Sequence, residues 1–296
     1  MLGEALVDLV CPRPVAALAE ADLFAPSPGG VAANVAIVAA RHGAAVGLAG
    51  GVGDDAWGRW LRAQLAREGV DLRFFPAREG ARTGVAFVAV DPDGEPTYEL
   101  YGDDGASVRD ALADRLDEAL EATDGLLLTT NALVDEQQRE LVLELRERAL
   151  AAGKAIVFDP NVRLHRWPLR SRAQQMANAC VRGALLVRAT AAEAELMTGE
   201  SDPEMAARAL LAAGARMVVI TRGAAGAILR GELRLDVPGV PARVRSTMGA
   251  GDTMTGILLA HLARSGWYPA AAAAALPEAV RAAARATERW SALAPA

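Results

Sequence analysis

The stretch STMGAGDTMTG, residues 246–256, places three small residues directly before an acid. Gly249, Ala250 and Gly251 would let a ligand approach the backbone closely, because almost no side chain intervenes. The apolar run that follows Asp252 predicts a helix that begins at this residue. The N–H groups and the dipole at a helix start favour an anion such as phosphate. Asp252 could cap that helix, or it could take a proton from a hydroxyl that attacks phosphorus.

Further stretches rich in glycine or polar residues occur along the chain. They read GGVAANVA at 29–36, GGVGDDAWG at 50–58, FDPNVR at 158–163 and VVITRGAAGA at 218–227. In this order, and followed by TMGAGD, they resemble the ribokinase-like (PfkB-type) family of carbohydrate kinases, whose late signature is D-T-x-G-A-G-D before a helix. The resemblance runs over nearly the whole chain and is closest to the fructokinase and 2-keto-3-deoxygluconate kinase branch. Several stretches in the same order are more specific than any one motif.

The resemblance implies an ATP-dependent sugar kinase, which transfers the γ-phosphate of ATP to a hydroxyl of a small sugar. Asp252 then matches the catalytic base, and Gly249, Ala250 and Gly251 match an anion hole. Carboxylates and amides are suitable hydrogen-bond partners for a polyol. The sugar-binding residues implied in this way are Asp8, Gly30, Asn34, Tyr101, Arg163 and Asp252.

The same resemblance implies ATP and Mg²⁺ as cofactors. Glu193 matches an acid that acts on magnesium through water, but Thr190 stands where the family carries the Asn of N-x-x-E, so we expect an altered magnesium dependence. Ser246 replaces the first Asp of the late signature, which helps to build a monovalent-cation site in relatives, so potassium activation is not implied. The residues expected to bind ATP are Asn161, Thr221, Gly223, Gly226 and Gly251.

Local structural roles remain open for several of these side chains. Asp8 could simply end a strand, Asn34 could cap a helix, and Arg163 could form a surface ion pair. The departures at Ser246 and Thr190 also leave open a catalytically impaired paralogue that binds or regulates. A dinucleotide-binding oxidoreductase fits poorly, because no G-x-G-x-x-G follows the first expected strand.

The substrate argument depends on charge. Gly102, Asp103 and Asp104 stand where sugar-acid kinases tend to carry Arg or Lys, and acids there would repel an anionic sugar. We therefore expect a neutral sugar, with fructose as the first candidate. 2-Keto-3-deoxygluconate, another sugar acid or a nucleoside is the alternative within the family.

Strands and helices alternate along most of the chain, which predicts a mostly parallel sheet with helices on both faces. In residues 83–101, apolar and polar residues alternate on both sides of a turn sequence, DPDG. This pattern predicts a β-hairpin. With the resemblance, this gives a single three-layer α/β/α ribokinase-like domain over 1–296, with a small β lid formed by 9–26 and 80–106. The strands expected outside the hairpin are 4–10, 44–53, 125–130, 155–160, 184–189 and 216–221.

Composition limits the remaining possibilities. Of 296 residues, 52% are hydrophobic and 23% charged, which suits a large core, and the net charge of −6 argues against a nucleic-acid partner. No apolar run long enough to cross a membrane is present, and the N-terminal stretch carries Glu4 and Asp8 in place of a basic region. Two isolated cysteines suit a reducing compartment. We expect a cytoplasmic protein, and the resemblance implies a homodimer.

Overall fold

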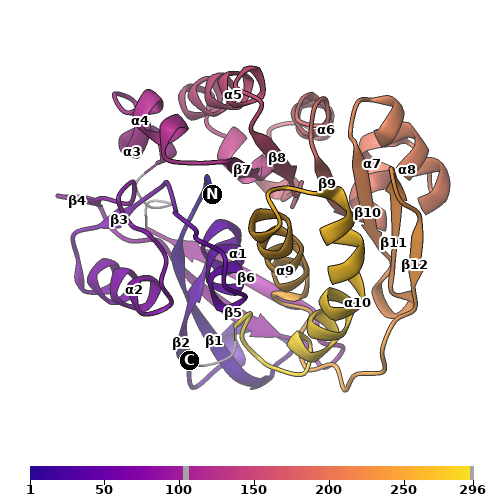
Figure 1. Cartoon of the computed structure of the whole chain (residues 1–296). Coiled ribbons are helices and arrows are strands. Elements are labelled where there is room, and N and C mark those ends of the chain that lie inside the picture. Colours follow the sequence, from indigo (N-terminus) through magenta and orange to yellow (C-terminus); the bar gives the residue numbers. More distant parts are fainter. Residues whose placement is uncertain (103–106, 294–296) are drawn as a thin grey trace.

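The computed structural model describes residues 1–102 and 107–293 (Figure 1). Asp103 and Asp104, which entered the substrate argument, lie outside the described residues.

Within these ranges, six strands form the main sheet in the order β12-β11-β10-β9-β8-β7. Strands β7 to β10 are parallel to one another, while β11 and β12 are antiparallel additions at one edge. This confirms the mostly parallel sheet predicted from the alternation. The strands span β7 (Gly125–Leu128), β8 (Ala155–Phe158), β9 (Leu186–Thr190), β10 (Met217–Thr221), β11 (Ala227–Gly231) and β12 (Leu235–Val237).

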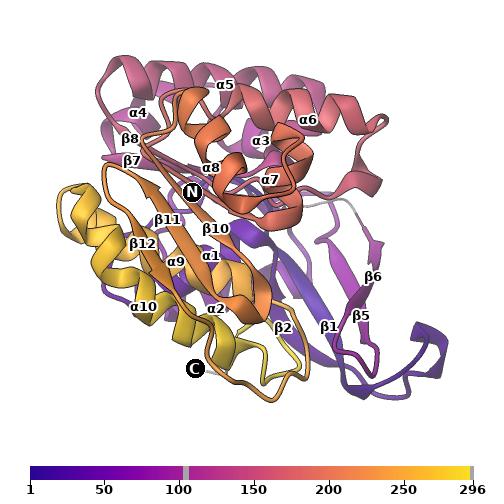
Figure 2. The same cartoon turned by 90° about the vertical axis from the view of Figure 1, so that its right-hand side faces the viewer.

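Helices cover both faces of this sheet, as Figures 1 and 2 show. Successive apolar residues of a strand point to opposite faces, so Leu126 and Leu128 join one core and Leu127 the other. The Leu127 side packs on α1 (Val31–Arg41), α2 (Ala56–Arg67), α9 (Ala250–Arg264) and α10 (Pro269–Ala286). The opposite side packs on α3 (Val108–Leu112), α4 (Leu116–Glu121), α5 (Glu136–Ala151), α6 (Arg170–Ala179), α7 (Ala191–Thr198) and α8 (Pro203–Ala212). Short 3₁₀ turns are η1 (Leu18–Glu20), η2 (Thr130–Leu133), η3 (Leu164–Arg166) and η4 (Gly223–Ala225).

A separate sheet of four strands, in the described part of the chain, has the order β2-β1-β5-β6. Its strands β5 and β6 are the predicted hairpin, and they lie apart from the main sheet in Figure 2. The predicted first strand, 4–10, belongs to this second sheet, because β1 pairs with β2 and β5. The strands span β1 (Leu6–Pro14), β2 (Ala25–Gly29), β5 (Val85–Val90) and β6 (Pro96–Tyr101).

The strand predicted over 44–53 is only partly formed. Isolated parallel bridges pair Leu2 with Ala49 and Gly47 with Asp71, and a two-residue strand β3 (Val52–Gly53) pairs with β4 (Ala77–Arg78). The backbone N–H of Leu2 donates to the carbonyl of Leu127 in β7. Leu2 therefore lies beside β7, and its bridge to Ala49 places residues 44–53 next in line beyond that edge of the main sheet. In residues 1–102 and 107–293, no helix is long and apolar enough to cross a membrane.

Candidate active site

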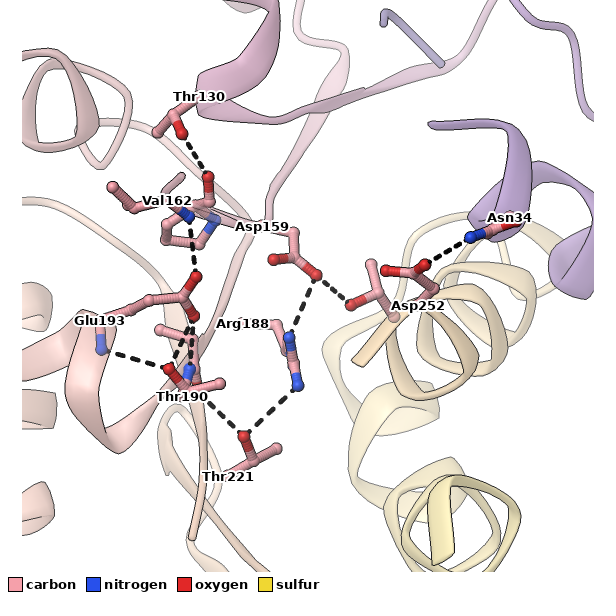
Figure 3. A network of polar contacts seen from close by, with 12 residues as sticks. Asn34, Thr130, Asp159, Val162, Arg188, Thr190, Glu193, Thr221 and Asp252 are labelled. Atoms are coloured by element: carbon pink, nitrogen blue, oxygen red, sulfur yellow. Dashed lines mark hydrogen bonds and ion pairs between the residues drawn. The ribbon is translucent and has the colours of Figure 1, made fainter. Parts of the chain in front are cut away.

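Four of the predicted motifs, at 29–36, 158–163, 218–227 and 246–256, meet near the carboxyl ends of β8, β9 and β10, where the N-terminus of α9 lies (Figure 3). Ligands of open α/β sheets bind at this edge of the strands. Helices α1 and α9, which pack on the same face of the sheet, bring together here two side chains that are 218 positions apart in the chain.

The helix that carries the opening motif begins two residues earlier than predicted, at Ala250. Gly249 is its N-cap, in the left-handed conformation with φ 71°, and no side chain caps the helix. Asp252 is the third residue of this helix, and its Oδ2 accepts a hydrogen bond of 2.8 Å from Asn34 Nδ2. The N-cap of α1 is Gly30, so the capping roles considered for Asp252 and Asn34 are both wrong. The two side chains instead join α1 to α9 at the site.

Burial controls the chemistry of Asp252, which is 8% exposed. Loss of solvent raises the pKa of this carboxyl, while the Asn34 amide and the charges of Arg163 and Arg188 oppose the rise. A carboxylate with a raised pKa binds a proton more strongly than an exposed one, so it is a better general base near neutral pH. The electrostatics of Asp252 therefore fit the role implied by the family resemblance.

Asp8 faces the same region from β1. It is buried, and burial together with the nearby Asp252 charge raises its pKa to about 8, against the lowering effect of Arg163. Tyr98 of β6 is near the same carboxyls: its pKa is raised by burial and by the charges of Asp8 and Asp252, although the residue is 38% exposed. The guanidinium of Arg163 lies over the Tyr98 ring, 5.9 Å from its centroid. Asp8, Tyr98 and Arg163 therefore lie near one another and close enough to Asp252 for their charges to interact.

Tyr101 does not reach this group, which corrects the sequence prediction. Directly paired residues share a face of a sheet, and Asp8 pairs with Ala86, which pairs with Leu100. Tyr101 pairs with Val85 and so points to the other face, where it is 55% exposed and its hydroxyl donates to Glu99 Oε2 at 3.0 Å. Tyr98 is two positions from Leu100 along β6, so its side chain lies on the same face of the sheet as Asp8.

We expect Asp8→Asn to stabilise the protein increasingly as pH rises. The folded pKa of about 8 lies above the ordinary value of 3.8, so the folded state is progressively disfavoured as pH rises between these values. The substitution removes this cost, so the gain in Tm should grow with pH and level off above about pH 8. Scanning calorimetry from acidic to alkaline pH measures it, with the exposed Asp114→Asn as a control. A gain in Tm that does not depend on pH would contradict the buried state of Asp8.

A second polar network lies on the other side of Asp252 (Figure 3). Asp159 follows β8 and is fully buried, and its Oδ2 accepts from the hydroxyl of Thr255 at 2.5 Å and from Arg188 Nη1 at 3.4 Å. Burial raises the pKa of Asp159 to about 6, although the Arg188 charge opposes the rise. Arg188 Nη2 also contacts the hydroxyl of Thr221 at 3.4 Å. The network thus joins β8, β9 and β10 to helix α9.

The loop after β8 is held by Glu193. One oxygen of this carboxylate accepts from the backbone of Val162 at 2.9 Å. The other accepts from the backbone and hydroxyl of Thr190, which caps α7. Asn161 in this loop has a positive φ of 40°, and its side-chain oxygen is buried without a partner in the described residues. Glu193 therefore positions the Asn161 loop, and its predicted action on magnesium through water stays a prediction.

The predicted glycines differ in their surroundings. Gly30 has φ 90°, and a Cβ there would lie 2.5 Å from the carbonyl oxygen of Glu4, so only glycine fits. Gly223 has nothing within 4 Å of its Cβ position, which leaves its loop open beside Thr221. Gly226 packs on the chain, with its Cβ position 2.1 Å from the carbonyl oxygen of Val237. Packing therefore explains why glycine occupies position 226, and the predicted contact of Gly226 with ATP stays a prediction.

Sequence reasoning also missed polar residues around the site. Arg188 lies within the apolar strand β9 yet is 5% exposed, and a charge inside a buried strand was the available signal. Glu4 accepts from the backbone of Val31 at 3.3 Å and from Asn131 Nδ2 at 3.1 Å, beside the start of α1. Ser246, by contrast, is fully buried and its hydroxyl accepts from the backbone of Met248 at 3.2 Å. Its role there is to shape the loop before Gly249.

Comparisons with known proteins agree with this geometry. Residues 1–289 match the pfkB family carbohydrate kinase model. The chain is 32% identical to Fructokinase-1 of Oryza sativa subsp. japonica over 262 residues, which cover 88% of this chain and 81% of the relative.

Solved structures agree as well. A Vibrio cholerae O395 fructokinase double mutant, in a form bound to fructose, ADP and potassium ion, has a TM-score of 0.83 and 26% identity, covering 98% of this chain and 92% of that one. Aminoimidazole riboside kinase from Salmonella enterica, complexed with aminoimidazole riboside and an ATP analogue, has a TM-score of 0.81 and 28% identity, covering 98% and 93%. These similarities confirm the ribokinase-like α/β fold.

Proposed function

Since the chain belongs to the pfkB family of carbohydrate kinases and is a sugar phosphotransferase by that membership, we propose that it phosphorylates a small neutral sugar, with fructose as the first candidate. The observation that carries this proposal is the buried Asp252 carboxylate at the start of α9, hydrogen-bonded to Asn34 of α1. That arrangement puts a proton acceptor directly beside the helix N-terminus that favours an anion. A base and an anion site at one point are what transfer of phosphate to a hydroxyl requires.

The reaction proposed for this site is a direct displacement. The acceptor hydroxyl oxygen forms a bond to the γ-phosphorus of ATP while the bond from that phosphorus to the β–γ bridging oxygen breaks. ADP leaves with the electron pair, and Asp252 takes the hydroxyl proton. The backbone N–H groups at residues 249–251 would stabilise the charge on the transferred group.

The residues on the ATP side fit a nucleotide with a divalent ion. Among the described residues, no group of three His, Cys, Asp or Glu could hold a metal by itself. Mg²⁺ commonly uses one or two protein oxygens together with substrate phosphates and water. The buried oxygens of Asp159 and Asn161 that have no partner in the described residues would be available to that ion or its waters. When bound, Mg²⁺ would neutralise phosphate charge.

The acceptor side supports a neutral sugar. Asp8 and Asp252 lie close enough for the charge of one to raise the pKa of the other, so a carboxylate on the sugar would add a third acid. The positive charge of Arg163, which lies over the Tyr98 ring, could pair with such a carboxylate, which keeps a sugar acid such as 2-keto-3-deoxygluconate as the alternative. The relatives favour fructose, since the rice relative is a fructokinase and the Vibrio protein holds fructose.

Two further parts of the proposal come from the family resemblance, and a third comes from the sequence composition. The sheet β2-β1-β5-β6 carries Asp8 and Tyr98 and would act as a lid that excludes water, which competes as a phosphoryl acceptor. The protein would form a homodimer and act in the cytoplasm.

The proposal predicts sugar-dependent ADP release with Mg-ATP. We expect fructose to give the highest kcat/KM in a panel with ribose, glucose, 2-keto-3-deoxygluconate, tagatose 6-phosphate and adenosine. Each compound is assayed with and without potassium, and Ser246 leads us to expect little potassium activation. Preference for the sugar acid would move the assignment to the alternative, and binding without turnover of any compound would indicate an impaired paralogue.

A further inference from the structure

Arg188 is a buried cation at the point where the predicted sugar, nucleotide and anion-hole motifs meet (Figure 3). We propose that its guanidinium binds the β- and γ-phosphates of the nucleotide and stabilises the phosphoryl group during transfer. This inference rests on the proposed kinase function. It assigns a phosphate-contacting role to a residue outside every motif named above.

The position of the guanidinium is defined from three sides. Nη1 contacts Asp159 after β8, and Nη2 contacts Thr221 at the end of β10. A Cβ placed on Gly251 would lie 2.8 Å from Nη1 and 3.0 Å from Nη2, so the guanidinium faces the first turn of α9. Since that turn favours an anion, an anion held there would meet the positive charge of Arg188 as well as backbone N–H groups.

The guanidinium is incompletely paired within the described residues. Its contacts with Asp159 and Thr221 are both 3.4 Å, longer than the ~2.7–2.9 Å of charge-assisted hydrogen bonds. Its Nε is buried with no hydrogen-bond partner in that part of the chain. The short bond of Asp159 goes to Thr255 instead, at 2.5 Å. An arginine that is 5% exposed with unused donors is suited to a further acceptor with several oxygens, and phosphate matches its planar fork.

A simpler role is also consistent with these contacts, since Arg188 could only neutralise the buried Asp159. The two roles predict different effects on the affinities for ligands that carry different numbers of phosphates. If Arg188 contacts the phosphates, its loss weakens binding only of ligands that carry the β- or γ-phosphate. If it only neutralises Asp159, its loss disturbs the folded site and weakens binding of all the ligands equally.

The test measures binding of adenosine, AMP, ADP and β,γ-methylene-ATP to wild type and Arg188→Gln by titration calorimetry. We expect adenosine and AMP to bind almost equally to both proteins. The ATP analogue should bind about 10–100-fold more weakly to the variant, as for loss of a hydrogen-bonded charge. Binding of ADP with aluminium fluoride and sugar, a mimic of the transfer state, should fall by about 10²–10³-fold, and kcat by a similar factor.

Arg146→Gln is the matched control, because Arg146 is also buried but bonds to backbone carbonyls of Cys180 and Arg182, away from the site. It should leave the nucleotide series unchanged even if Tm falls. Should Arg188→Gln not fold, Arg188→Lys keeps the charge and loses the fork, and a smaller loss with the same dependence on phosphate number is expected. Equal weakening of all four compounds, or no weakening of any, overturns the proposal. Absence of turnover in wild type would remove the kinase function, while the binding series would still decide the role of Arg188.

Discussion

Asp252→Asn should lower kcat by about 10³–10⁴-fold, at the upper end of the contribution of a general base. The asparagine keeps the shape of the side chain and can still accept from Asn34, so the join between α1 and α9 is preserved. It cannot accept the proton of the attacking hydroxyl. Steady-state ADP release and the Kd values for sugar and ATP measure the effect, and both Kd values should change little.

Stability separates this prediction from simple misfolding. The pKa of Asp252 is raised in the folded state, so its ionised form is disfavoured there, and removing it should leave Tm unchanged or higher, most of all at alkaline pH. Asp8→Asn is the matched comparison, because it removes another buried carboxyl of the site without removing the proposed base. Turnover within tenfold of wild type in Asp252→Asn would show that another group accepts the proton.

Much of the fold could be predicted because the spacing of apolar residues and the lengths of the apolar runs indicate the same strands and helices. The apolar run around Leu126–Leu127–Leu128 is buried on both faces, as parallel strands are, and the DPDG turn marked the hairpin. The partners of Val7 and Asp8 could not be predicted, since pairing depends on contacts distant in sequence. Residues 44–53 contain mainly glycine and small side chains, which say little about where a strand is regular.

The local geometry of the candidate site could be predicted where a motif specifies the backbone, and could not be predicted where it depends on strand register. Gly249 and Asp252 belong to one helix start, so local sequence places them correctly relative to each other. Tyr101 and Tyr98 point to opposite faces of β6, and the register of pairing with β5 decides which of them faces the site. Arg188 reaches the site from inside a strand, and no pattern along β9 shows how far its side chain extends.

Gly249→Ala should disrupt the proposed anion hole and lower both stability and turnover. An L-residue in the left-handed conformation costs about 1–2 kcal/mol, and Gly249 has φ 71°. The added Cβ would also lie 2.4 Å from the carbonyl oxygen and 2.6 Å from the Cα of Ala292, so backbone must move. Because Gly249 is the N-cap of α9, that movement shifts the N–H groups that would face phosphate, and kcat should fall by about 10²–10³-fold.

Gly266→Ala is a close control for the conformational cost. Gly266 follows the same helix with φ 72°, and nothing lies within 4 Å of its Cβ position. It should lose about 1 kcal/mol of unfolding free energy in denaturant titrations and keep its kcat, because only the backbone conformation is penalised. Gly249→Ala should lose more than this, since it adds the collision with Ala292. If the two variants lost equal stability and both kept their turnover, the contact with Ala292 could not be what holds the start of α9 in its phosphate-binding geometry.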